Sequence, residues 1–509
     1  MRSLPAARSI SSNPSQGELR RLALELMPRV TVTEFDNLNY QAEVVARLKN
    51  STFFVSDVEI HQNRIPVAEA EEWAARQDAY IAERDMILIE GYIGPDQEFR
   101  TGCRLFIEKT QPNIAGMQAH LYFPPDAEWT PEFDVIYTPG LDAPGKPDGR
   151  LIIVDLDRWV TRVIGSDYFG ESKMGGLRMW NKLVYDRGGL ALHAGLKTFP
   201  AGEGVEEEKS MLIIGLSGTG KTTTTFRRQL GSLPVQDDFV ALMPGGVVHT
   251  TEAGCFAKTF GLDPDDEPTI FGGTTSPEAW LENVGVDSSG KVDFFDTSHT
   301  ANGRCTFPLS KIRHRDPRHV PPASYLLILN RSDHIIPAVA RLHRSQVAAY
   351  FMLGESKGTS AGGDAEAGKS LRVPGTNPFF FNDDAWQGNR LVELVETTPD
   401  LEVFVLNTGR VGGNDEATSK KVEISDSSAI VRSLVLGDVD WVSDPDFGYE
   451  IPAAVAGVDP ELLRPSLLYS RLGRDAEYQD WVERLKRERI EYLNGFDELK
   501  PEVAAGLYG

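Results

Sequence analysis

The sequence predicts a mixed α/β protein of two domains. Short apolar runs typical of buried strands alternate with helical stretches along the whole chain. At residues 211–230 a strand-like run, a glycine-rich loop and a helix starting at 223 follow one another directly. A polar Gly/Glu connector at 200–209 precedes this unit. We therefore expect an N-terminal mixed α/β domain at 1–199 and a second domain at 200–509.

The predicted N-terminal domain contains several β-like runs and one clear helix. The helix is expected at 67–84, a stretch rich in Ala and Glu. The segments around 168–175 and 188–194 are interpreted as extended. The β-like runs are residues 53–55, 86–89, 104–107 and 151–154.

The second domain repeats this alternation after its glycine-rich loop. Apolar runs at 325–329 and 401–406 predict buried strands, and 475–493 predicts a charged amphipathic helix. Residues 354–378 are rich in Gly, Ser, Ala and charge, which is too polar for core. We expect a mobile loop there.

Composition narrows the classes of partner. The chain of 509 residues carries 52 basic and 75 acidic side chains, a net charge of −23. Such a surface repels nucleic acid and anionic membranes, so neither is expected as a partner. The sequence contains no run of about 18 apolar residues, so no membrane span is predicted. We expect a small-molecule substrate; the oligomeric state is not predicted.

The cysteines and the N-terminal residues indicate in which cellular compartment the protein is expected. Cys103, Cys255 and Cys305 are far apart and odd in number, which fits neither a disulfide framework nor a metal site. This favours a cytoplasmic protein. The first 17 residues lack acids and carry serines, so a transit peptide is an alternative, but a frayed tail is the preferred interpretation.

The glycine-rich loop carries the strongest functional signal. It fits the phosphate-binding pattern of Gly, four residues, then Gly-Lys-Thr at every fixed position. Backbone N–H groups and a helix N-terminus would surround an anion there, with the lysine on the β- and γ-phosphates and the threonine hydroxyl on Mg²⁺. The alternative is a structural turn. The expected nucleotide-binding residues are Gly215, Leu216, Ser217, Gly218, Thr219, Gly220, Lys221, Thr222 and Thr223.

Charged residues downstream suit phosphoryl transfer, which needs a metal and positive charge. Asp237 and Asp238 follow a strand-like run and are predicted to hold Mg²⁺ or its bound waters, against a surface pair in a turn. Lys258 and Arg341 are candidates for neutralising phosphate charge, with surface ion pairs as the alternative. His193, taken alone, is more typical of a packed, hydrogen-bonded residue than of a ligand.

These segments, taken in order, resemble ATP-dependent phosphoenolpyruvate carboxykinases. The loop matches the family's G-L-S-G-T-G-K-T-T, and residues 251–259 are similar to its E-G-G-C-Y-A-K-T motif. The stretch 168–175 resembles Y-x-G-E-M-K-K-G, with His193 at the family's spacing. Residues 267–270, 281–284, 336–342 and 405–409 resemble E-P-x-I, L-E-N-V, L-P-P-V-S-R-L and L-V-N-T-G.

The resemblance implies a bilobal fold, with a phosphate-loop nucleotide-binding domain and a cleft between the domains. It implies decarboxylation of oxaloacetate and transfer of the γ-phosphoryl group of ATP to the enolate, a step of gluconeogenesis. Mg²⁺ would accompany ATP, and a second ion, typically Mn²⁺, would bridge enzyme, phosphate and substrate. The loop at 354–378 falls where the family has a lid.

Residue roles follow from the matched motifs. Lys221, Lys258 and Arg341 would act on the phosphates as catalytic residues, together with Asp237. His193 and Asp238 would bind the second metal, and Thr222 the first. Lys421 and Ser427 fall where the family holds the adenosine end. On the substrate side the resemblance assigns Arg47 and Tyr168, with Lys173 beside them.

One departure concerns the second metal. The family's metal-binding lysine in E-M-K-K-G is Met174 here, and a thioether suits Mn²⁺ badly. In an extended segment the adjacent Lys173 would point to the other face. Most of the family's charged residues around Arg47 are also missing. The alternatives are therefore an ATP-dependent kinase with another small-molecule or protein hydroxyl acceptor, and a non-catalytic nucleotide-binding regulator.

Overall fold

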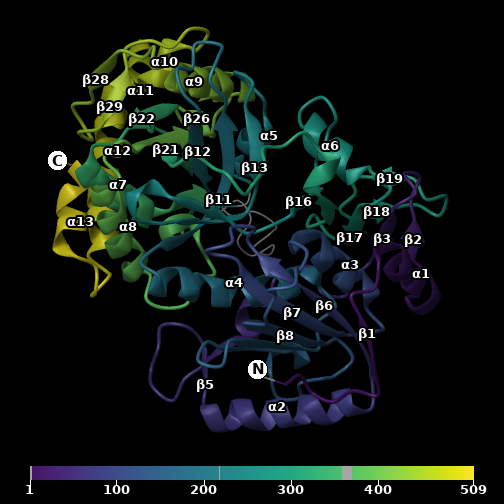
Figure 1. The fold of residues 1–509 in the computed structure, drawn as a ribbon. Coiled ribbons are helices and arrows are strands. Elements are labelled where there is room, and N and C mark those ends of the chain that lie inside the picture. The colour runs from purple at the N-terminus through teal and green to yellow at the C-terminus, as the bar shows by residue number, and fades with distance from the viewer. Residues whose placement is uncertain (1–2, 217, 358–369, 509) are drawn as a thin grey trace.

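The computed structural model describes residues 3–216, 218–357 and 370–508 (Figure 1). Ser217 and residues 358–369 of the predicted lid lie outside the described residues. The chain forms two large sheets, one smaller sheet and surrounding helices, which confirms the mixed α/β class.

The first large sheet is built from the N-terminal third of the chain. Its eight strands mix parallel and antiparallel pairs, and both faces are covered, so its strands are mostly apolar throughout. In spatial order the strands are β1 (Ser9–Ser12), β6 (Asp85–Ile93), β7 (Thr101–Glu108), β8 (Phe133–Thr138), β10 (Val160–Ile164), β9 (Leu151–Asp155), β4 (Thr52–Val55) and β5 (Arg64–Ile65).

The second large sheet has three adjacent parallel strands at its centre, β12, β21 and β25. The glycine-rich loop follows β12, at the carboxyl end of these strands, where open α/β sheets bind ligands. In spatial order the strands are β15 (Val248–Thr250), β14 (Phe239–Leu242), β11 (Leu190–Phe199), β12 (Lys209–Ile214), β21 (Ala323–Asn330), β25 (Glu402–Asn407), β22 (Val339–Arg341), β29 (Glu450–Pro452) and β28 (Trp441–Ser443), with β13 (Leu233–Gln236) beside β11.

A smaller sheet joins distant parts of the chain. Its order is β16 (Gly254–Lys258), β20 (Arg304–Pro308), β17 (Trp280–Glu282), β3 (Leu38–Tyr40) and β2 (Val30–Val32). Because β3 pairs with β17, residues near 40 are fixed against residues near 282. Three two-stranded ribbons complete the strands: β18 (Gly285–Val286) with β19 (Val292–Asp293), β23 (Glu355–Lys357) with β24 (Ser370–Arg372), and β26 (Arg410–Val411) with β27 (Lys420–Lys421).

Helices cover the sheets. In Figure 1, α2 lies below the first sheet, while the C-terminal helices gather beside the second. Helix α4 contacts strands of both large sheets. The helices are α1 (Gln16–Leu26), α2 (Val67–Ala82), α3 (Pro112–Leu121), α4 (Phe169–Asp186), α5 (Lys221–Phe226), α6 (Pro268–Thr274), α7 (Arg344–Leu353), α8 (Ala385–Thr397), α9 (Ile424–Leu436), α10 (Pro460–Leu463), α11 (Pro465–Arg471), α12 (Asp475–Leu493) and α13 (Pro501–Ala505).

The strands predicted at 53–55, 86–89, 104–107, 151–154, 211–214, 325–329 and 401–406 are confirmed, as are the helices at 67–84 and 475–493 apart from the last residues of the former. Two expectations are wrong. The N-terminus is not a frayed tail, because β1 pairs in parallel with β6. The segment 168–175 is not extended, because α4 begins at Phe169 and its first turns are fully buried.

The sheets divide the chain at a different place from the predicted boundary at 199/200. Strand β11 precedes that boundary but pairs with β12 and β14 inside the second sheet. The described ends of the predicted loop at 354–378 have regular structure, since β23 and β24 form a ribbon and Thr376 is buried. No described helix is long and apolar enough to span a membrane.

Candidate active site

The glycine-rich loop connects β12 to α5. Gly218 and Gly220 have φ values of 85° and 91°, a conformation that a side chain disfavours. The loop is held from outside: Thr408 Oγ1 donates to the Thr219 carbonyl at 2.8 Å, and Arg331 Nη1 donates to the Gly218 carbonyl at 2.7 Å. The N-terminal end of α5 is thereby aimed into a cavity, as anion binding requires.

Both aspartates after β13 contact the start of α5. Thr222 Oγ1 donates to Asp237 Oδ2 at 2.9 Å, and Lys221 Nζ lies 3.2 Å from Asp238 Oδ1. Burial raises the pKa of Asp237 to about 7. The other oxygen of Asp237, Oδ1, is buried and has no hydrogen-bond partner. A divalent ion shared by this carboxylate and the Thr222 hydroxyl would satisfy it.

Lys173, Asp238 and Glu252 form a buried charge cluster. The ammonium of Lys173 lies 2.5 Å from Asp238 Oδ2 and 2.9 Å from Glu252 Oε1. Burial alone would lower the pKa of Lys173, but the two carboxylates raise it above its ordinary value. Burial alone would raise the pKa of Asp238, but Lys173 and Lys221 hold it well below its usual range. Asp238 is therefore a charged carboxylate.

His193 faces Asp238 in an arrangement suited to a cation. The carbonyl of Thr376 only accepts, so its 2.9 Å contact makes Nδ1 the donor and leaves the Nε2 lone pair 2.9 Å from Asp238 Oδ1. Burial and Lys221 lower the pKa of His193, which favours the neutral ring. Two electron-rich atoms that face each other fit a shared metal ion. The described residues contain no group of three His, Cys, Asp or Glu side chains around one point, so a metal at this pair would need ligands of another kind.

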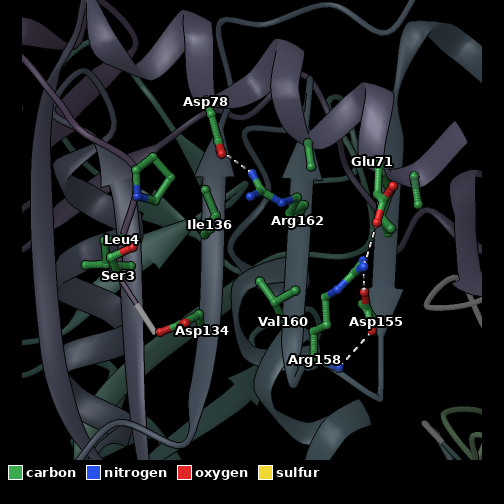
Figure 2. A pocket seen from close by; sticks show the side chains of 14 residues that line it. Ser3, Leu4, Glu71, Asp78, Asp134, Ile136, Asp155, Arg158, Val160 and Arg162 are labelled. Atoms are coloured by element: carbon green, nitrogen blue, oxygen red, sulfur yellow. Dashed lines mark hydrogen bonds and ion pairs between the residues drawn. The ribbon is translucent and has the colours of Figure 1, made fainter. Parts of the chain in front are cut away.

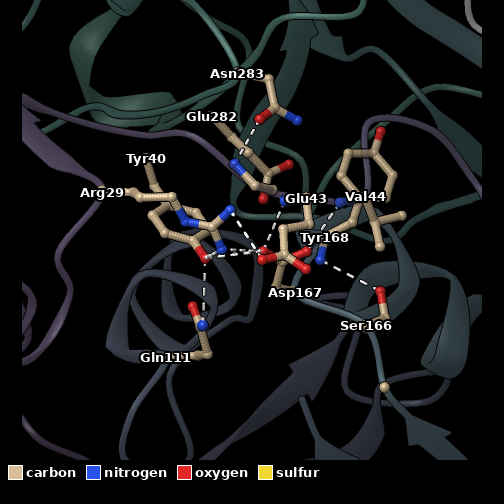
Figure 3. A network of polar contacts seen from close by, with 12 residues as sticks. Arg29, Tyr40, Glu43, Val44, Gln111, Ser166, Asp167, Tyr168, Glu282 and Asn283 are labelled. Atoms are coloured by element: carbon tan, nitrogen blue, oxygen red, sulfur yellow. Dashed lines mark hydrogen bonds and ion pairs between the residues drawn. The ribbon is translucent and has the colours of Figure 1, made fainter. Parts of the chain in front are cut away.

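The segment that carries Arg47 has little regular structure of its own. Its backbone is instead bound by side chains from elsewhere, above all Asp167, which accepts from the N–H groups of Glu43 and Val44 at 2.8 and 3.0 Å (Figure 3). Tyr40 also donates to this carboxylate. Asn283 and Glu171 likewise accept from the backbone N–H groups of Ala42 and Leu48. Asn302 donates to the backbone carbonyl of Val45.

A cavity brings the predicted substrate and phosphate residues together. Arg47, Tyr168 and Met174 line it beside His193, so Met174 faces the site while Lys173 lies in the buried cluster. Burial and the neighbouring Arg304 lower the pKa of Lys258 to about 8. The remaining lining includes Leu216, Gly218, Gly220, Lys221, Thr222, Thr223, Asp237, Asp238, Lys258, Glu267 and Arg304.

A second cavity adjoins the first on the other side of the loop. Gly218, Gly220 and Thr223 line both cavities. Lys421 and Ser427, the predicted adenosine-side residues, lie in the second one with apolar side chains of α9. A bound triphosphate could therefore run from one cavity to the other across the loop.

Arg341 lies apart from these residues. Its guanidinium is 2.7 Å from Glu450 Oε2 and 3.6 Å from Glu402 Oε1, and it stacks over Trp441. Arg341 is not among the described residues that line either cavity. Because β22 runs antiparallel to β25 and Arg341 is paired with Phe404, Arg341 lies away from the loop end of the sheet.

Sequence reasoning missed several residues of the site. Arg304 was not considered, yet its buried Nε has no hydrogen-bond partner and the side chain lines the cavity. Glu252 and Glu267 lie within the matched motifs at 251–259 and 267–270, but the sequence assigns neither a role. In the structure Glu267 accepts a hydrogen bond from Thr223 Oγ1 at 2.6 Å. Their positions in the T-E-A-G-C-F-A-K and E-P-T-I stretches were the available signal. For Arg304, a single arginine in a strand, the sequence offered no such signal.

A further cavity lies between α2 and the first sheet, on the face opposite to α4. Figure 2 shows that its charged side chains pair with one another: Arg158 contacts Glu71 and Asp155, and Arg162 contacts Asp78. These guanidinium groups already have carboxylate partners. This cavity also lies away from the phosphate-binding loop, which lines the other two cavities.

Together, the fold and the cavity define an α/β enzyme with a phosphate-binding loop, paired carboxylates and lysines suited to nucleotide-dependent phosphoryl transfer. Comparison with known proteins specifies it further. The family model described as phosphoenolpyruvate carboxykinase, in its ATP form, matches residues 8–461. The chain belongs to the ATP-dependent phosphoenolpyruvate carboxykinase family. Membership implies use of ATP and of a divalent metal.

Three relatives illustrate the similarity; each is named an ATP-dependent phosphoenolpyruvate carboxykinase. That of Aeropyrum pernix is 33% identical over 431 residues, 81% of this chain and 82% of the relative. That of Mesorhizobium japonicum is 29% identical over 447 residues, covering 85% and 80%. One from Moorella thermoacetica is 30% identical over 421 residues, covering 79% and 77%.

Proposed function

We propose that this chain converts oxaloacetate and ATP to phosphoenolpyruvate, ADP and CO₂. The observation that carries this is the single cavity lined by Arg47, Tyr168, Lys258 and the loop lysine Lys221. This cavity would offer a cationic, partly apolar pocket for a small dicarboxylate beside the expected γ-phosphate. The family favours this reaction over a kinase with another acceptor.

The residues present fit two divalent ions. Thr222 and the unpartnered oxygen of Asp237 would hold Mg²⁺ with ATP, while His193 and Asp238 would hold a second ion such as Mn²⁺. Bound ions would neutralise charge on the phosphate and enolate oxygens. Because Met174 replaces the family's lysine ligand, water or substrate must complete the second site.

Protein side chains account for the remaining tasks. Arg47 would bind a substrate carboxylate, and Tyr168 would orient the substrate against the wall of the cavity. Lys221, Lys258 and Arg304 would neutralise the phosphoryl group as it moves in line between oxygens. Arg304 takes the place given to Arg341 by sequence, since use of Arg341 would require its pair with Glu450 to break.

The larger organisation is proposed on the same basis. The two large sheets would belong to two lobes, with the nucleotide at the second, residues 200–509 together with β11. Leu371, Val373 and Pro378, from the described part of the predicted lid, line the cavity, which supports the proposal that the lid closes over the substrate. We place the protein in the cytoplasm, with a small-molecule substrate and without nucleic-acid or membrane partners.

The test is formation of phosphoenolpyruvate and ADP by purified protein given oxaloacetate, ATP, Mg²⁺ and Mn²⁺. We expect equal amounts of both products and their loss in Lys221→Ala. Lys209→Ala serves as the matched control, because Lys209 begins β12, the strand before the loop, and pairs with Glu207 outside the cavity. ATP hydrolysis or binding without phosphoenolpyruvate would contradict the proposal and redirect the search to another acceptor.

A further inference from the structure

One face of β11 follows α5 from its phosphate end to its far end. Alternate residues of a strand share a face, so His193, Gly195 and Lys197 point the same way. His193 is the residue that faces Asp238 in the candidate active site. A side chain on Gly195 would collide with the hydroxyl of Thr225, so this glycine allows close packing of α5. Lys197 continues the same face to the C-terminal end of the helix.

The ammonium of Lys197 is buried there with three acceptors. Nζ donates to the carbonyls of Thr224 and Arg227 at 3.0 and 2.6 Å, and to Gln229 Oε1 at 3.3 Å. The residue is completely inaccessible to solvent. Within the described part of the chain no carboxylate pairs with it. Its three N–H donors are thus all used on the end of α5 and the turn that follows.

Helix α5 needs such support. It has six residues, four of them threonine, and β-branched residues lose side-chain freedom in helices. Its last carbonyls have no partners within the helix. A cation at the C-terminus compensates them and complements the negative end of the helix dipole. The opposite end of the same short helix begins at Lys221, at the expected phosphates.

We propose that Lys197 is a positioning residue for the nucleotide, whose buried ammonium fixes α5 so that the phosphate loop binds ATP, and whose charge tunes that affinity. This inference rests on the proposed nucleotide site. It adds to that site a group that does not touch the nucleotide.

The charge of Lys197 is poised to change near neutral pH. Burial, with a smaller effect of the neighbouring Arg227, lowers the pKa of Lys197 to about 7. Arg227 is the charged group of the described residues that acts on it. Deprotonation leaves two N–H donors for three acceptors and removes the cation from the helix end. ATP affinity should therefore fall as pH rises through this range.

Three variants test the proposal by calorimetric titration with MgATP. Lys197→Met removes the charge at similar volume and should raise the Kd for ATP about tenfold, while KM for oxaloacetate stays unchanged. Lys197→Arg retains charge at every pH and should restore most of the affinity. Lys209→Met, on the neighbouring strand, is the matched control and should bind ATP normally.

The pH profile separates positioning from general stability. Wild-type Kd should rise from pH 6.5 to 8.5 more than that of Lys197→Arg, because the titrations of ATP, Asp237 and Lys258 are common to both proteins and only that of Lys197 differs. Identical profiles, or wild-type affinity in Lys197→Met, would overturn the proposal. If Lys197→Met does not fold, the comparison of wild type with Lys197→Arg still decides. Unchanged ATP binding in Lys221→Ala would instead refute the nucleotide site.

Discussion

Asp237 and Asp238 show how neighbouring residues acquire different chemistry from their surroundings. Asp238 is surrounded by the ammonium groups of Lys173 and Lys221, and these keep it ionised. Asp237 is buried with one oxygen on the Thr222 hydroxyl and the other unpartnered, so its pKa is raised to about 7. A cation near Asp237 would favour its charged form. The pair therefore provides one permanently charged carboxylate and one that responds to the ligand.

At the same scale, Arg304 and Arg341 differ in their surroundings, since Arg304 lines the cavity and Arg341 pairs with Glu450. Arg304→Ala should reduce kcat by about a hundredfold, because it removes a cation from the cavity where negative charge develops. Arg341→Ala should leave kcat within about threefold, because its guanidinium contacts Glu450 and Trp441 outside the cavity. Steady-state assays on both variants, with thermal melting to verify folding, check this. A larger loss of kcat in Arg341→Ala would restore its role in catalysis.

At the scale of elements, buried strands were predictable and buried helices were less so. The run Met211–Ile214 is apolar and short, and it became β12. The first turns of helix α4 contain three glycines and a serine, which have low helix propensity. The segment is helical because strands of both large sheets pack against it. Tertiary burial of that kind leaves no periodic polar face to detect. The helical turn also explains why Lys173, and not Met174, joins the buried carboxylates.

The segment before β4 depends on its neighbours in the same way. Asp167→Asn replaces one carboxylate oxygen with an NH₂ group that would face the N–H of either Glu43 or Val44, so one of the two hydrogen bonds is lost. We expect KM for oxaloacetate to rise about tenfold through misplacement of Arg47, with KM for ATP unchanged. Asp155→Asn, a carboxylate of the first sheet on the remote cavity, is the control. Equal rises in both KM values would point to general destabilisation instead.

At the scale of the whole molecule, pairings between sequence-distant segments hold the fold together. Sequence order could predict the loop and its carboxylates because they lie within about 25 residues of one another, a spacing typical of local motifs. It could not predict that β3 pairs with β17, or that α12 is tied to β23. Such pairings follow from packing across the chain, and no local pattern encodes them.

The tie between α12 and β23 is a buried ion pair that should dominate the acid stability of the C-terminal helices. Arg489 binds Glu355 through two bonds, Nε to Oε1 at 2.9 Å and Nη2 to Oε2 at 2.7 Å. Burial alone would raise the pKa of Glu355, but Arg489 and the neighbouring Arg372 hold it below its ordinary value. Its contribution to stability is therefore present above the unfolded pKa and is lost as pH falls through the folded one.

Arg489→Met leaves Glu355 buried with Arg372 as its remaining cation, and should cost about 3–5 kcal/mol of unfolding free energy at neutral pH. The variant should also lose less stability between pH 7 and pH 4 than wild type, because protonation of Glu355 no longer breaks the bond to Arg489. Thermal melts across this range measure both effects. Arg484→Met is the control, since Arg484 lies on the same helix and pairs with Glu488 at the surface. Equal melting temperatures in the two variants would show that this ion pair does not hold α12 in place.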